Sequence, residues 1–214
     1  MSDEPGEGAR QLPRELWGRL RADPARAPEH LALAAAEFHG PAAAGWAAER
    51  RRRYGGDGAQ LAGMAKKRHA SLARFGGAAT GVGGFVTVIP DLAGLAWIQA
   101  RLVFFVAAAF DFDPLDPMRP AELLVLQGLY SSPETARAAL DGVGRSVAST
   151  WVDAKLSASG ERTLVNRLMV MGGKRVGKKF AARLVPGLAV VVNAAGNERD
   201  TRALADRAIA FYGG

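Results

Sequence analysis

Residues 76–110 read GGAATGVGGFVTVIPDLAGLAWIQARLVFFVAAAF, and only Asp91 and Arg101 carry a charge in this stretch. The pattern predicts two helical segments rich in glycine and alanine, joined by a bend at residues 89–91. A segment this apolar belongs in the core of a folded domain, in lipid, or in each at different times. A spanning helix needs about 20 consecutive apolar residues. Glycines before Pro90 and polar side chains after it interrupt the run, so we expect no stable transmembrane helix.

Composition favours one main domain and an anionic partner. The chain has 214 residues, 49% of them hydrophobic, with a net charge of +7 and no cysteine. This length supports one main domain, residues 58–214, preceded by a helical extension, residues 1–57. The positive charge favours a phospholipid surface or nucleic acid as partner. Without cysteine the chain forms no disulfide and no thiolate-ligated metal site.

The N-terminal region predicts an unprocessed cytoplasmic chain with two helices. MSDEPGEGARQLPRELW lacks the basic-then-apolar order of a secretory signal. We expect helices over residues 29–38 and 41–54, the second starting at Pro41. Four arginines, residues 50–53, end that second helix. They suit the negative end of a helix dipole, and the alternative is a patch that binds phosphate or lipid headgroups.

The central stretch predicts a glycine-bearing helix from residue 60 and a buried helix over residues 92–110, since the latter is apolar on all sides. Asp91 and Arg101 lie about 15 Å apart along that helix and cannot pair with each other. We expect a structural polar network made of Asp91, Gln99, Arg101, Glu122, Glu198 and Arg199. We expect an apolar cavity or a membrane-facing surface made of Gly77, Gly81, Val82, Gly84, Phe85, Trp97, Leu102 and Phe105.

The remaining segments also predict helices. The acidic stretch of residues 111–117 lacks the glycine and glutamate of a calcium loop and predicts turns. Helices follow over residues 121–130, from Ser132 as N-cap to 142, and over 144–156. A closing helix from residue 197 has an expected ion pair between Arg202 and Asp206. Its expected buried stripe is Thr201, Leu204, Ala208 and Phe211. No strand pattern occurs, so the predicted fold is an all-α helical bundle.

An internal repeat relates the two halves of this bundle. A shift of 96 residues places Leu72, Gly76, Gly77, Gly81, Pro90, Leu92 and Ala93 on Leu168, Gly172, Gly173, Gly177, Pro186, Leu188 and Ala189. The repeat predicts two helix–proline bend–helix hairpins about a pseudo-two-fold axis. The second copy has a basic face that is either solvated or in contact with an anionic membrane. This face consists of Lys174, Arg175, Lys178, Lys179 and Arg183.

Three segments resemble the EcsC family of bacterial proteins. They are GAATGVGGFVTVIPDLAGLAWIQARLVFFVAAAFDFDP, ELLVLQGLY and RVGKKFAARLVPGLAVVVNAAGNERDTRALADRAIAFY. The family takes its name from a protein encoded beside an ABC transporter linked to secretion. The resemblance implies a helical fold near a membrane and supplies no catalytic residues.

These observations leave several functions open. We expect a peripheral protein at the inner face of the cell membrane that binds anionic lipid, acts without catalysis and assists a membrane transport protein. The alternatives are a cytosolic interaction module without lipid contact and, less favoured, an enzyme. We expect no nucleic-acid partner, because the basic residues are dispersed and form no known motif. We expect no cofactor or metal, because His30, His39 and His69 lack metal-ligand spacing.

Overall fold

The computed structural model describes residues 12–76, 88–147 and 197–214, with the side chains of residues 74–76, 88–92 and 197 left out. The described helices are α1 (Arg14–Ala22), the 3₁₀ turn η1 (Pro24–Arg26), α2 (Ala27–Tyr54), α3 (Gly58–Gly76), α4 (Val88–Ala109), α5 (Arg119–Leu126), α6 (Pro133–Leu140) and α11 (Asn197–Gly213). No strand occurs within these ranges. The all-α prediction is therefore confirmed.

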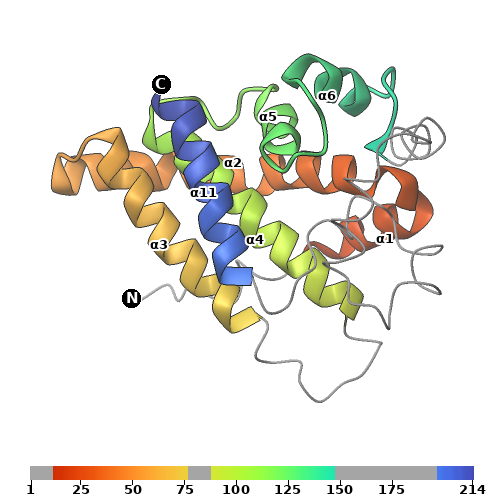
Figure 1. Cartoon of the computed structure of the whole chain (residues 1–214), viewed down its shortest axis with the longest axis horizontal. Coiled ribbons are helices and arrows are strands. Elements are labelled where there is room, and N and C mark those ends of the chain that lie inside the picture. The colour runs from red at the N-terminus through yellow and green to blue at the C-terminus, as the bar shows by residue number, and fades with distance from the viewer. Residues whose placement is uncertain (1–11, 77–87, 148–196) are drawn as a thin grey trace, which may run out of the picture.

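Helix α4 is the centre of the bundle. It packs against α2, α3 and α11, while α1, α5 and α6 pack on α2 (Figure 1). The side chains of Trp97, Leu102, Phe104 and Phe105 are almost completely buried. They belong to one core that also includes Leu16 and other residues from α1 and α2, so helices on both sides of residue 58 share it. None of the described helices has both the length and the apolarity needed to cross a membrane.

Helix α2 replaces the two helices expected over residues 29–38 and 41–54. It continues through Pro41 as one helix of 28 residues. Proline inside a helix removes a hydrogen bond and is costly. Packing outweighs this cost here, because a Cβ added at the preceding Gly40 would lie 2.9 Å from Leu115 Cδ2 and 3.0 Å from the Pro114 carbonyl oxygen. This close approach fixes the middle of α2 against the loop after α4.

Proline also sits differently in α4 than expected. The helix already includes residues 88–91, so the predicted bend at Ile89, Pro90 and Asp91 is wrong at these residues. Pro90 lies in the first turn of the described helix, where its missing N–H removes no intrahelical hydrogen bond.

The predicted turns and caps are confirmed where the structure describes them. The Asp113 carboxylate accepts from the backbone N–H of Leu115 at 2.9 Å, and Asp116 accepts from Met118 at 2.8 Å. Ser132 caps α6 by accepting from the Thr135 N–H at 3.3 Å. These side chains stabilise the connections that return the chain from α4 to α5 and α6.

Helix α11 differs from its prediction in two details. Arg202 pairs with Glu198 at 2.9 Å rather than with Asp206, which reaches across to Lys66 on α3. Phe211 is 45% exposed, and the neighbouring Tyr212 takes the buried position. The sequence favoured the more apolar Phe211, but the Tyr212 hydroxyl finds a buried acceptor that makes its burial favourable.

One of the arginines that end α2, Arg51, has a structural role. Arg51 donates to the carbonyl oxygens of Ala108 and Ala109 at 3.0 and 2.7 Å, and it pairs with Asp111 at 2.9 Å. It thereby stabilises the C-terminal end of α4, and its charge also interacts favourably with the dipole at the C-terminal end of its own helix, α2. The predicted helix over 144–156 is described only at residues 144–147, where residues 144–146 are not helical. The second copy of the internal repeat and its basic face lie outside the described residues.

Candidate functional site: a basic cluster in the helical core

Three helices bring basic side chains together inside the bundle. His39 comes from α2, Arg68 and His69 from α3, and Arg101 from α4. We call these four residues the basic core cluster. His39 and His69 are fully or almost fully buried and Arg101 is only 8% exposed. Arg68 is partly exposed, so the cluster reaches the surface at this side chain.

Aromatic rings of α4 hold the cluster in place. The His39 ring lies 4.4 Å from the Trp97 ring, measured between centroids. One turn further along α4, Arg101 places its Cζ 4.8 Å from the centroid of Phe105. The His69 ring contacts the same phenyl ring at 5.1 Å. The basic groups therefore lie against a shared aromatic wall, which packs on imidazole and guanidinium planes alike.

Several buried nitrogen atoms of this region have no hydrogen-bond partner in the described part of the chain. His69 donates from Nδ1 to the Ala65 carbonyl at 2.8 Å, which leaves Nε2 free in the neutral ring. The unpartnered atoms are His39 Nε2, His69 Nε2, Trp97 Nε1 and Arg101 Nε. Buried polar atoms in native proteins are normally satisfied, so a group of four in one region requires an explanation.

The electrostatics of the cluster are one-sided. Burial lowers the pKa of His39 to about 3, with further contributions from Arg101 and His69. Burial also lowers the pKa of His69 to about 3, as do Arg101 and Arg68, against the opposing hydrogen bond to Ala65. The pKa of Arg101 falls to about 10 through burial and the nearby Arg68. Every titratable side chain of the described residues that acts on these pKa values is basic.

Arg101 remains charged at neutral pH even with this lowered pKa. No carboxylate among the described side chains pairs with it, or with Arg68. A buried cation without a counter-charge is unfavourable. Chemically, the cluster suits an anion and repels a cation. The described residues contain no group of three potential metal ligands.

A second buried polar group joins α5 to α11. Glu122 accepts from Arg119 and from the Tyr212 hydroxyl, the latter at 2.6 Å. Burial raises the pKa of Tyr212, and Glu122 raises it further. Arg119 also pairs with Asp116 at 3.3 Å. Opposite charges are paired here, although Arg119 Nε has no partner among the described residues, so this group connects helices.

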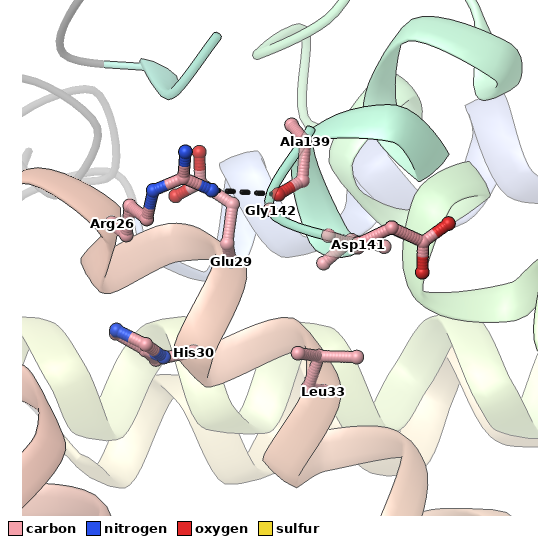
Figure 2. A pocket seen from close by; sticks show the side chains of 8 residues that line it. Arg26, Glu29, His30, Leu33, Ala139, Asp141 and Gly142 are labelled. Atoms are coloured by element: carbon pink, nitrogen blue, oxygen red, sulfur yellow. Dashed lines mark hydrogen bonds between the residues drawn. The ribbon is translucent and has the colours of Figure 1, made fainter. Parts of the chain in front are cut away.

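A third polar group borders a pocket of about 410 Å³ between the start of α2 and the end of α6. Figure 2 shows Arg26 reaching across to the Ala139 carbonyl, which it contacts at 2.8 Å. Beside it, Glu29 accepts from the Tyr130 hydroxyl at 2.5 Å and from the Val147 N–H at 2.9 Å. These bonds are internal and attach α6 and the following segment to α2.

The residues of the predicted polar network occupy separate places. Gln99 contacts Thr201 at 3.4 Å, Glu122 lies in the α5–α11 group and Glu198 pairs with Arg202. Arg199 is exposed. The side chain of Asp91 is outside the described residues.

Among the predicted cavity or membrane-facing residues, the structure buries Trp97, Leu102 and Phe105 in the core. The others, Gly77, Gly81, Val82, Gly84 and Phe85, lie outside the described residues, as does the basic face of Lys174, Arg175, Lys178, Lys179 and Arg183.

Sequence reasoning found Arg101 but not its neighbours. His39 and His69 were considered only as metal ligands, for which their spacing is wrong. Each lies on a helix with an alanine-rich buried face, and a histidine on such a face is a usable signal for a core position. The spacing of residues along the chain does not show that α2 and α3 both pack against α4 and bring the two histidines to it.

A search of curated proteins and a search of solved structures each give no match. The model of the EcsC protein family matches residues 58–213, which include α3, α4, α5, α6 and most of the basic core cluster. His39, on α2, precedes the matched region. This match spans more than half of the sequence, and the chain belongs to the EcsC protein family.

Proposed function

We propose that this chain is a peripheral membrane-associated helical protein that binds anionic lipid and assists membrane transport or secretion without catalysis of its own. The observation that carries the proposal is the basic core cluster. Its buried Arg101 lies among basic neighbours and beside aromatic rings, in the middle of an apolar bundle. An anionic amphiphile supplies the missing negative charge and an apolar portion that suits the surrounding core.

The net charge supports the same type of partner. At +7 the chain is attracted to anionic surfaces over the distance of a Debye length. The cytoplasmic leaflet of a cell membrane is such a surface, and each basic residue near it contributes about 1 kcal/mol. The inner face of the cell membrane is therefore the site of action that we propose.

Vesicle co-sedimentation tests the proposal. Full-length protein is mixed at low salt with vesicles of phosphatidylglycerol and phosphatidylcholine, and in parallel with pure phosphatidylcholine vesicles. We expect sedimentation with the anionic vesicles only, and weaker sedimentation at high salt. The variant Arg68→Gln removes one charge from the basic core cluster. Its matched control is Lys67→Gln, which removes an exposed charge from the same helix. No sedimentation at low salt, together with no lipid in protein purified without detergent, would rule out the proposal.

A specific observation favours the second candidate, a cytosolic interaction module without lipid contact. Trp97, Leu102 and Phe105 are packed in the core. In this alternative the apolar residues of α4 serve stability alone, and the protein remains in the supernatant with vesicles of either composition. The co-sedimentation experiment therefore separates the two functions.

A further inference from the structure

We infer that the basic core cluster is a phosphate-binding site, in which Arg68 and Arg101 hold the phosphate beside His39 and His69. The geometry of helices α2, α3 and α4 defines the site. Only the nature of the molecule that carries the phosphate, a membrane phospholipid, rests on the proposed function.

An anion suits this position because Arg101 is a largely buried cation whose charged neighbours among the described residues are basic. As a residue, Arg101 is more than nine-tenths buried, and its Nε has no hydrogen-bond partner in the part of the chain that the structure describes. Among the described residues, its close neighbours include the phenyl ring of Phe105 and the basic side chain of Arg68. Aromatic contact offsets only part of the lost hydration of a guanidinium, so a counter-anion at this position stabilises the bundle.

Phosphate suits the cluster better than carboxylate does. Guanidinium groups bind phosphate oxygens in pairs, and here two of them come from adjoining helices. The indole N–H of Trp97 is a further buried donor without a partner. A carboxylate offers two oxygen atoms in one plane, whereas a phosphate presents oxygens in several directions and reaches donors on more than one helix.

The histidines adapt to the charge of the ligand. Within the described helices, the titratable groups that face them are each other, Arg68 from α3 and Arg101 from α4. Helix α11 also packs on α3, but its Asp206 pairs with Lys66. A bound phosphate adds a negative charge to this basic set and so raises the pKa of both imidazoles. Phosphate binding at acidic pH is therefore coupled to proton uptake.

Titration calorimetry with three soluble probes tests the inference on the full chain. The first probe is dihexanoylphosphatidylglycerol below its micelle concentration, which has a phosphodiester and short tails. The second is glycerol phosphate, which lacks tails, and the third is decanoate, which has a tail and a carboxylate. We expect both phosphate probes to bind at one site and decanoate to bind at least 10-fold more weakly than the lipid, on the order of one lost charged hydrogen bond.

Variants locate the site. Arg101→Gln should weaken binding of both phosphate probes by about 10- to 100-fold, and Arg101→Lys should restore only part of it. Arg68→Gln, at a partly exposed position, gives a second variant with less risk to folding. Lys67→Gln removes the same charge from the same helix and should leave the affinity within about 3-fold of wild type, as expected for an exposed charge. Circular dichroism confirms that each variant is folded.

The outcomes separate the inference from the proposed function. Decanoate binding as tightly as the phospholipid would overturn the phosphate site and leave lipid binding intact. Arginine-dependent binding of glycerol phosphate without lipid binding would support the site and overturn the lipid function. Absence of binding by all probes, or unchanged affinity in both folded arginine variants, would overturn the phosphate site.

Discussion

Acidification should destabilise the unliganded protein through His39 and His69. Their pKa values are lowered to about 3 in the folded state, whereas an unfolded histidine titrates near 6.5. Above pH 6.5 both states carry neutral imidazoles and the histidines do not change the stability. Below pH 6.5 the unfolded chain binds protons that the folded chain does not, so stability is lost progressively until about pH 3.

The size of this loss follows from the width of the pH interval. Each pH unit below 6.5 costs about 1.4 kcal/mol per histidine, so at pH 4.5 each one lowers the free energy of unfolding by between roughly 2 and 3 kcal/mol. Together they remove about 5 kcal/mol. This is comparable to the whole stability of many domains, which is about 5–15 kcal/mol.

Urea unfolding followed by circular dichroism at several pH values measures the effect. The double variant His39→Phe, His69→Phe keeps aromatic packing against Trp97 and Phe105 and removes both titrating groups. We expect wild type to lose about 5 kcal/mol more than this variant between pH 7 and pH 4.5. The matched control is His30→Gln, at a partly exposed residue 3.6 Å from Asp23. Parallel pH profiles for wild type and the double variant would refute the account of a buried neutral pair.

Three further predictions concern stability. Arg101→Met should raise the free energy of unfolding of the unliganded protein by about 1–3 kcal/mol in urea titrations, because it removes an uncompensated buried charge; a loss instead would show that the guanidinium is satisfied. Glu122→Gln should lower the free energy of unfolding by about 3 kcal/mol, because Arg119 then stays buried without its carboxylate partner. Thermal unfolding at neutral pH measures this loss. Gly40→Ala should lower the melting temperature by the equivalent of about 1–3 kcal/mol through the clash with Leu115 and the backbone before it, and no change would mean that this loop moves freely.

The helices of this fold were predictable because their signals are local. The apolar circumference of α4 indicated a central helix, and Ser132 marked the start of α6 by a side chain that satisfies a backbone N–H. Pro41 misled the prediction because the local cost of proline was outweighed by a contact with a loop more than 70 residues away. Tyr212 was missed because its burial depends on Glu122, on another helix.

The candidate site was predictable only in part for the same reason. Arg101 stands out as a lone base in an apolar stretch, and the sequence indicates that it needs a partner. It does not indicate that Arg101 acts on the buried His39 and His69, because helix packing rather than spacing along the chain brings these residues together. The expected acidic partners Glu122 and Glu198 are instead engaged with Arg119 and Arg202.

Native mass spectrometry of the full chain, purified without detergent and then incubated with phosphatidylglycerol, tests the central claim most directly. The account predicts one bound phospholipid per chain in wild type and in Lys67→Gln. It predicts little or none in Arg101→Gln, whose folding is verified by circular dichroism. A folded wild-type protein that retains no phospholipid, or an Arg101→Gln variant that retains as much as wild type, would contradict the claim that the basic core cluster holds an anionic lipid.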